Sequence, residues 1–134
     1  MTVSYDLPAE FNRSPGAPPS SIAHCESQLG LKLPVDYADF LKTADGGEGF
    51  LGENYLILWS CDELPQLNLS YEVAKFLLGF LIFGSDGGGE AYGFDIRSDP
   101  WKIVQIPFIG MNWGDARPMG PSFNAFLEQL LHSD

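Results

Sequence analysis

The stretch Leu81–Ile106, LIFGSDGGGEAYGFDIRSDPWKIVQI, decides the fold class of this chain. Three runs of apolar and aromatic residues are separated by two turn sequences, Gly84–Gly89 and Ser98–Pro100. Such runs, bounded by Gly, Ser, Asp and Pro, are typical of short strands joined by tight turns. The stretch therefore predicts an antiparallel meander of three strands, Leu81–Phe83, Glu90–Asp95 and Trp101–Ile106.

A fourth strand is predicted on the N-terminal side of this meander. The segment Gly52–Trp59, GENYLILW, has large residues at both odd and even positions. That pattern is typical of a strand that is buried on both faces, so we expect a central strand here.

Two helices are predicted before that strand. The first begins at Ser20 or Ser21 and ends at Leu29, because Gly30 suits the left-handed position after a helix. The second begins at Pro34 and ends at Gly46-Gly47, with an apolar side formed by Val35, Tyr37, Phe40, Leu41 and Ala44.

The remaining segments complete the predicted architecture. Ser60, Asp62 and Glu63 predict a capped helical turn, whereas Leu64–Tyr71 follows neither period and is assigned as loop with some helix. Ser122 is expected to cap a last helix with an apolar stripe from Phe123 to Leu131. Since helices and strands do not alternate, we predict a single α+β domain, in which an antiparallel or mixed sheet of about 4–6 strands packs against helices.

The first 19 residues differ in composition from the rest. Pro15, Pro18 and Pro19, with Gly16, hinder regular helix and sheet pairing. We therefore expect residues 1–19 to form an N-terminal arm and residues 20–134 to form the domain.

Composition restricts the partners. The 134 residues include 7 basic and 18 acidic side chains, which gives a formal net charge of −11. This charge disfavours binding to nucleic acid or anionic lipid and favours a neutral or basic partner, although solubility explains the charge equally well. With two cysteines, no leader-like N-terminus and no apolar run of about 20 residues, we expect a cytoplasmic protein without a membrane segment.

The sequence offers little catalytic chemistry. The turn Gly84–Glu90 lacks the lysine of a phosphate-binding loop, and its carboxylates, Asp86 and Glu90, are too few for a calcium loop. The two cysteines and two histidines lack the spacing of a nucleophilic or metal site, and we expect Cys61 to serve as a small buried apolar residue. We therefore expect a protein that is not an enzyme, with no catalytic residue, metal or cofactor.

The three tryptophans are more informative. Trp59 and Trp101 adjoin predicted strands and are expected in the core, whereas Trp113 lies in the connection Gly110–Asp115. There, Trp113 either covers the core or is an exposed anchor beside Asp115 for a protein partner.

Motifs along most of the chain resemble the Smi/Knr domain family of the SUKH superfamily. The first half supplies a helix ending Leu29-Gly30, then Leu33-Pro34-x-Asp36-Tyr37-x-x-Phe40-Leu41 and Gly46-Gly47. The second half supplies the strand ending at Trp59, the turn Gly84–Gly89 followed by Glu90-x-Tyr92-x-Phe94-Asp95, and Ser122-Phe123-x-x-Phe126-Leu127. The resemblance covers residues 20–131, and it finds no match in residues 1–19 or 64–78.

This resemblance implies a non-catalytic protein-binding domain. Bacterial members of the family are mostly immunity proteins that bind and neutralise a cognate polymorphic toxin, often a nuclease or deaminase. By this hypothesis, acidic residues steer a basic toxin domain to a tryptophan anchor. The candidate residues are Trp59, Asp62, Glu63, Asp86, Glu90, Trp113 and Asp115. The alternatives are a housekeeping interaction or small-ligand-sensing domain and, third, an enzyme of unrecognised type.

Overall fold

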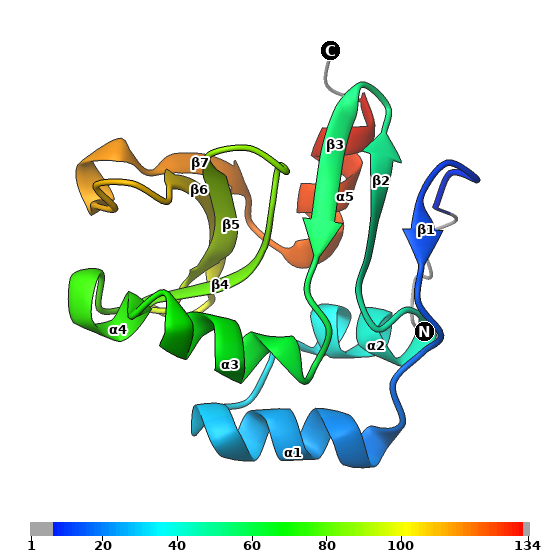
Figure 1. Cartoon of the computed structure of the whole chain (residues 1–134), viewed down its shortest axis with the longest axis horizontal. Coiled ribbons are helices and arrows are strands. Elements are labelled where there is room, and N and C mark those ends of the chain that lie inside the picture. The colour runs from blue at the N-terminus through cyan, green and yellow to red at the C-terminus, as the bar shows by residue number, and fades with distance from the viewer. Residues whose placement is uncertain (1–6, 133–134) are drawn as a thin grey trace.

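A computed structural model describes residues 7–132, which form one antiparallel sheet with helices around it (Figure 1). The helices are α1 (Pro19–Leu29), α2 (Val35–Thr43), α3 (Glu63–Ser70), α4 (Val73–Phe76), the 3-10 helix η1 (Trp113–Asp115) and α5 (Phe123–His132). The strands are β1 (Asn12–Arg13), β2 (Gly47–Leu51), β3 (Asn54–Leu58), β4 (Phe80–Ser85), β5 (Glu90–Asp95), β6 (Lys102–Pro107) and β7 (Arg117–Gly120). The α+β prediction is confirmed.

The sheet is an antiparallel meander throughout. Its strand order, β1-β2-β3-β4-β5-β6-β7, is the order of the chain. The three strands predicted from Leu81 onward are β4, β5 and β6, whose register pairs Leu81 with Phe94 and Phe94 with Ile103. The described sheet has seven strands rather than about 4–6, because β1, β2 and β7 were not predicted.

Strand β2 was not predicted because glycines stand at positions 47 and 49, where an alternating strand would have apolar side chains. A Cβ atom built on Gly49 would lie 2.5 Å from the Glu10 carbonyl oxygen. The glycine therefore allows the backbone of the N-terminal segment to lie directly against β2. The predicted ending of α2 at Gly46-Gly47 was also too late, because the helix ends at Thr43 and Gly47 begins β2.

The N-terminal segment is part of this sheet from residue 12 onward. Asn12 and Arg13 form β1 and pair with Glu48 and Gly47, so the segment expected to be an arm supplies a short strand to the sheet. Phe11 and Ala17 are buried in the core. The buried side chains of Phe11 and Ala17 thus attach the proline-rich segment to the domain.

Strand β3 is buried on one face only. Leu56 and Leu58 are buried, whereas Tyr55 and Ile57 are half-buried. The prediction of a central strand covered on both faces was therefore wrong, and the fully buried central strand is β4. The large residues on the open face of β3 are covered only in part by other elements.

The first two helices follow the prediction with two corrections. α1 begins at Pro19, after Pro18 at the N-cap position, rather than at Ser20 or Ser21; Gly30, with φ of 72°, ends it as expected. Val35 was assigned to the apolar side of α2, but its side chain is 77% exposed. It lies in the first turn of the helix, beyond the surface that Tyr37 and Leu41 bury.

The segment assigned as loop with some helix is mostly helical. Residues 63–70 form α3 and residues 73–76 form α4, joined by Glu72 with a left-handed φ of 53°. Few of the apolar residues here point into the core, because only Leu64, Val73 and Leu77 are buried. This one-sided burial explains why no clean helical period was visible.

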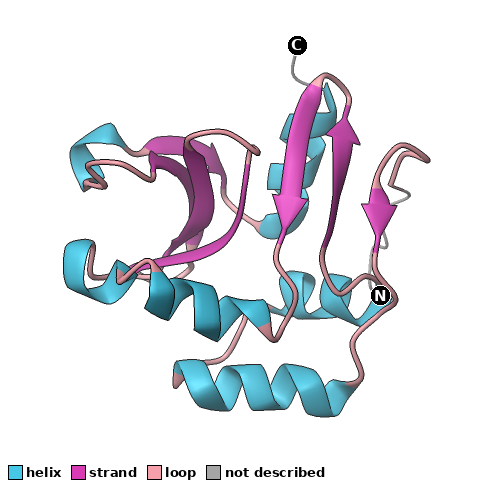
Figure 2. Cartoon of the chain, in the orientation of Figure 1, coloured by secondary structure: helices cyan, strands magenta, loops and turns pink. Residues whose placement is uncertain are grey.

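The core lies between the sheet and helices α2 and α5, and α5 lies behind β2 and β3 in the view of Figure 2. Tyr37 on α2 packs against Phe123 on α5, with ring centroids 4.8 Å apart. Phe83 on β4 packs against Phe94 on β5 at 4.9 Å and against Phe126 on α5 at 5.3 Å. These aromatic contacts hold α2 and α5 against the sheet, and β4 is buried along its whole length, where α3 and α4 also contact it. Within residues 7–132 no helix is long and apolar enough to cross a bilayer.

Candidate functional site

Three aromatic side chains from different parts of the chain, Trp59, Tyr71 and Phe108, form a row. The rings of Trp59 and Tyr71 are stacked with centroids 6.1 Å apart, and the ring of Phe108 lies 5.0 Å from Tyr71. Trp59 is buried, as predicted for the core, whereas Tyr71 is 46% exposed. The row joins the end of β3, the end of α3 and the residue after β6.

Exposed apolar side chains lie on α3, on α4 and the residues next to it, and on the connection after β6. We call these five residues the apolar patch: Leu69 (79% exposed), Tyr71 (46%), Phe76 (61%), Leu78 (77%) and Ile109 (93%). Two links bring the connection against the helices, because Phe108 contacts Tyr71 and the Trp113 indole Nε1 donates to the Leu78 carbonyl oxygen at 3.4 Å. Sequence reasoning missed this patch, and its signal was the aperiodic apolar run from Leu64 to Leu78.

Trp113 is fixed in place beside the patch. The Arg97 guanidinium lies 3.6 Å from the centroid of the Trp113 ring, and the Phe80 ring packs against its edge. Arg97 in turn donates two hydrogen bonds of 3.0 Å to the Asp95 carboxylate. These bonds lower the pKa of Asp95 and raise the pKa of Arg97. Trp113 is therefore a half-buried clamp on the end of α4, and Asp115 is exposed next to it.

The glycine-rich turn connects β4 to β5, which confirms the predicted hairpin. The Asp86 carboxylate accepts hydrogen bonds from the backbone N–H of Gly88 at 2.8 Å and of Glu90 at 3.2 Å. Glu90 accepts a bond from the Gln105 side chain at 3.0 Å. The Phe108 N–H donates to the Gly89 carbonyl oxygen at 2.9 Å, which places the turn next to the aromatic row. Both acidic candidates thus stabilise the turn and lie near one end of the row.

Two further acidic candidates stand where α3 begins. Glu63 accepts a hydrogen bond from the Ser60 N–H at 2.9 Å, and the Ser60 hydroxyl accepts one from the Glu63 N–H at 3.2 Å. This reciprocal pair is a capping box, as the sequence predicted. Asp62 and Glu63 are both exposed, and Trp59 lies shortly before them in the chain. The seven predicted residues therefore fall into three groups along the chain: Trp59 with Asp62 and Glu63, Asp86 with Glu90, and Trp113 with Asp115.

The cysteines show no nucleophilic character. Cys25 and Cys61 are both buried, which confirms the expectation for Cys61. Burial and nearby carboxylates raise the pKa of Cys25 to about 11 and that of Cys61 to about 12. Both thiols are therefore protonated at neutral pH, and only the thiolate is reactive.

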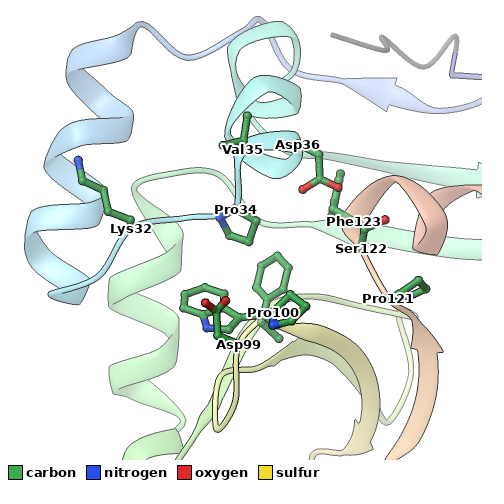
Figure 3. Close-up of a pocket in the computed structure, with 11 residues that line it drawn as sticks. Lys32, Pro34, Val35, Asp36, Asp99, Pro100, Pro121, Ser122 and Phe123 are labelled. Carbon is green, nitrogen blue, oxygen red and sulfur yellow. The ribbon is translucent and has the colours of Figure 1, made fainter. Parts of the chain in front are cut away.

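A groove of about 590 Å³ lies at a different place, between three segments of the chain. Its walls are Lys32 and residues 34–36 at the start of α2, residues 99–101 before β6, and residues 121–123 at the start of α5, and Phe94 also lines it. Figure 3 shows Pro34 opposite Asp99 and Pro100, with Lys32 on one side and Phe123 on the other. Trp101, expected in the core, is half-buried here and packs on Phe94 at 5.7 Å. None of the seven predicted residues lines this groove.

The chain was compared with protein families and with curated proteins. Residues 16–129 match the model of the SMI1 / KNR4 family (SUKH-1). No curated protein matches the chain. The match spans the sheet from β2 to β7, and it includes the aromatic row and the apolar patch.

Proposed function

Because the chain belongs to the SMI1 / KNR4 family (SUKH-1), we propose that it is a non-catalytic protein-binding domain of the immunity type. By this proposal it binds and neutralises a cognate toxin that has a basic surface. The toxin docks on the apolar patch, and the acidic residues around the aromatic row steer it there.

The apolar patch is the observation that carries this proposal. Seven large apolar side chains are exposed among residues 7–132, and five of them belong to the patch. Single exposed apolar residues need no explanation, whereas a group of them on one surface is typical of a protein interaction site. Tyr71 gives the patch an aromatic side chain that is backed by the stacked ring of Trp59, which is the arrangement of a binding hot spot.

Charge supports a basic partner. Glu72 follows Tyr71, Asp115 follows the Trp113 clamp, and the Asp86 turn adjoins Phe108, so exposed or half-buried carboxylates border the patch. The two nearby cations are already engaged, since Lys75 lies over the Phe76 ring and Arg97 over the Trp113 ring. Acidic borders around an apolar centre favour a partner with basic residues around its own apolar contact.

The first experiment identifies the partner and measures inhibition. We expect an affinity pull-down from native cell extract at low salt to recover a protein with a basic toxin domain, and the purified chain to inhibit the activity of that domain. Recovery of a partner that is not a toxin would instead support a housekeeping interaction domain.

The second experiment locates the binding surface with a matched pair of variants. Leu78→Glu places a charge in the patch, and Val35→Glu places the same charge on an equally exposed side chain, at 77% for both residues, outside it. We expect Leu78→Glu to weaken toxin binding by about 30-fold or more, the effect of losing a hot spot of about 2 kcal/mol. Val35→Glu should bind like the unmodified chain in isothermal titration calorimetry. If Val35→Glu weakened binding and Leu78→Glu did not, the toxin would bind at the groove that Val35 lines and not at the patch.

A further inference from the structure

The groove beside α2 has the size and lining of a ligand site that the proposed toxin interaction does not use. Its volume of about 590 Å³ lies within the usual range for binding pockets, roughly 300–1,000 Å³. Phe94 and Phe123, both buried, line it, and the half-buried Trp101 stands at one wall. The groove shares no residue with the apolar patch.

Each wall of the groove contains a proline, which cannot donate a backbone hydrogen bond to a ligand. Pro34, Pro100 and Pro121 have no backbone N–H, and one of them stands on each of the three wall segments. A peptide that binds by extending a sheet needs a row of N–H donors and carbonyl acceptors on its host. A proline-rich ligand suits such walls, because it does not bind by extending a sheet: its own prolines lack N–H groups and hold it in a preformed polyproline II conformation.

The charges at the groove add a preference. The Asp36 carboxylate is already engaged, because its oxygens accept hydrogen bonds from the N–H groups of Tyr37 at 2.8 Å and Asn124 at 3.0 Å. Lys32 is paired with Glu26 at 3.6 Å. Asp99 is exposed and, within residues 7–132, has neither an ion pair nor a hydrogen-bond partner. One carboxylate therefore remains to receive a cation, two residues before Trp101.

We propose that this groove binds a proline-rich segment of a protein in which a lysine or arginine stands next to the prolines. The proline rings lie against Trp101 and Pro100, since aromatic-lined grooves accept polyproline II segments by contact with their flat apolar faces. The basic side chain pairs with Asp99, which sets the direction and the charge preference of the ligand. This is a second binding activity, on a surface separate from the one proposed for the toxin.

Nuclear magnetic resonance offers a test with internal controls, because the three tryptophans occupy three different places. The probes are proline-rich peptides of about ten residues that carry Pro-x-x-Pro with an arginine at either end. We expect them to shift the indole N–H resonance of Trp101 in a saturable way and to leave those of Trp59 and Trp113 unmoved. Peptides in which glutamate replaces the arginine, or glycine replaces each proline, should bind at least about 5-fold more weakly.

Two carboxylate variants complete the test without disturbing the core. Asp99→Asn keeps the shape of the side chain and should weaken the arginine peptide to the level of its glutamate counterpart, whereas Glu53→Gln, on the exposed β2–β3 turn, should not. The proposal is overturned if no peptide shifts the Trp101 resonance at about 1 mM. It is equally overturned if peptides without proline shift it as strongly, or if Trp113 responds instead.

Discussion

The Asn68 side chain makes the hydrogen bonds to β4 that a neighbouring strand would otherwise make. The partner strand β3 pairs with β4 only at Ile57–Ser85 and Leu58–Gly84, which leaves the Ile82 backbone without a strand on that side. The Asn68 side chain donates to the Ile82 carbonyl oxygen at 2.8 Å and accepts from the Ile82 N–H at 2.9 Å. One amide side chain thus satisfies both backbone groups and attaches α3 to the sheet, which positions the aromatic row above it.

Replacement of Asn68 by alanine should therefore cost stability. We expect the free energy of unfolding of Asn68→Ala to fall by about 1–3 kcal/mol, because the two Ile82 backbone groups lose their partner. Gln66→Ala, an exposed amide on the same helix, should change it by less than about 0.5 kcal/mol. Urea denaturation followed by circular dichroism measures both values. Equal effects of the two variants would contradict the role given to Asn68.

At the scale of elements, Asp95, Arg97 and Trp113 form a series of contacts that attaches η1 to the residues after α4. The Asp95 carboxylate positions Arg97, Arg97 covers the ring of Trp113, and Trp113 donates to the last residue before Gly79. The turn residues on either side of its apolar run predicted β5, but no sequence pattern linked Asp95, the last residue of β5, to a tryptophan in a later connection. The contact exists because the β5–β6 turn brings Arg97 back over the end of α4.

This arrangement predicts a pH dependence of stability. Arg97 lowers the pKa of Asp95 below the usual 3.8, so the ion pair contributes stability that is fully present above that value. The contribution is lost as the pH falls through the lowered pKa. Asp95→Asn should therefore destabilise the protein at neutral pH, and the difference from the unmodified chain should shrink as the pH falls below 3.8. Denaturant titrations at a series of pH values test this, and a constant difference would contradict it.

At the scale of the whole molecule, the negative charge should raise the rate at which the proposed basic partner associates. A net charge of −11 attracts a basic partner over distances comparable to the screening length, about 8 Å at physiological salt. Because the apolar patch makes contact only after encounter, charge should act on the association rate and the patch on the dissociation rate.

The association rate should therefore fall with salt. We expect stopped-flow measurements with the cognate toxin to show at least about a 10-fold decrease in the association rate constant between low and high salt, with a smaller change in the dissociation rate constant. A rate constant for association that does not change with salt would exclude steering and leave the charge as a solubility feature. Leu78→Glu should instead raise the dissociation rate constant and change the association rate constant less.

The sequence by itself determined the α+β class, the meander from β4 to β6 and the family. Alternation, turn residues and helix ends are local properties, so they could be followed along the chain without knowledge of distant contacts. The same local logic predicted the capping box at Ser60 and Glu63 and the hairpin at Asp86, both of which the structure has.

Only the tertiary structure decided which side chains share a surface. Gly84 was assigned to the turn, yet it lies within β4, where an added Cβ atom would be 2.2 Å from the Ile57 carbonyl oxygen. The patch between α3, α4 and Ile109, the clamp on Trp113 and the groove at Trp101 likewise join segments that are distant in the chain. Such contacts depend on how the sheet curves and which face each helix covers, and no local pattern carries that information.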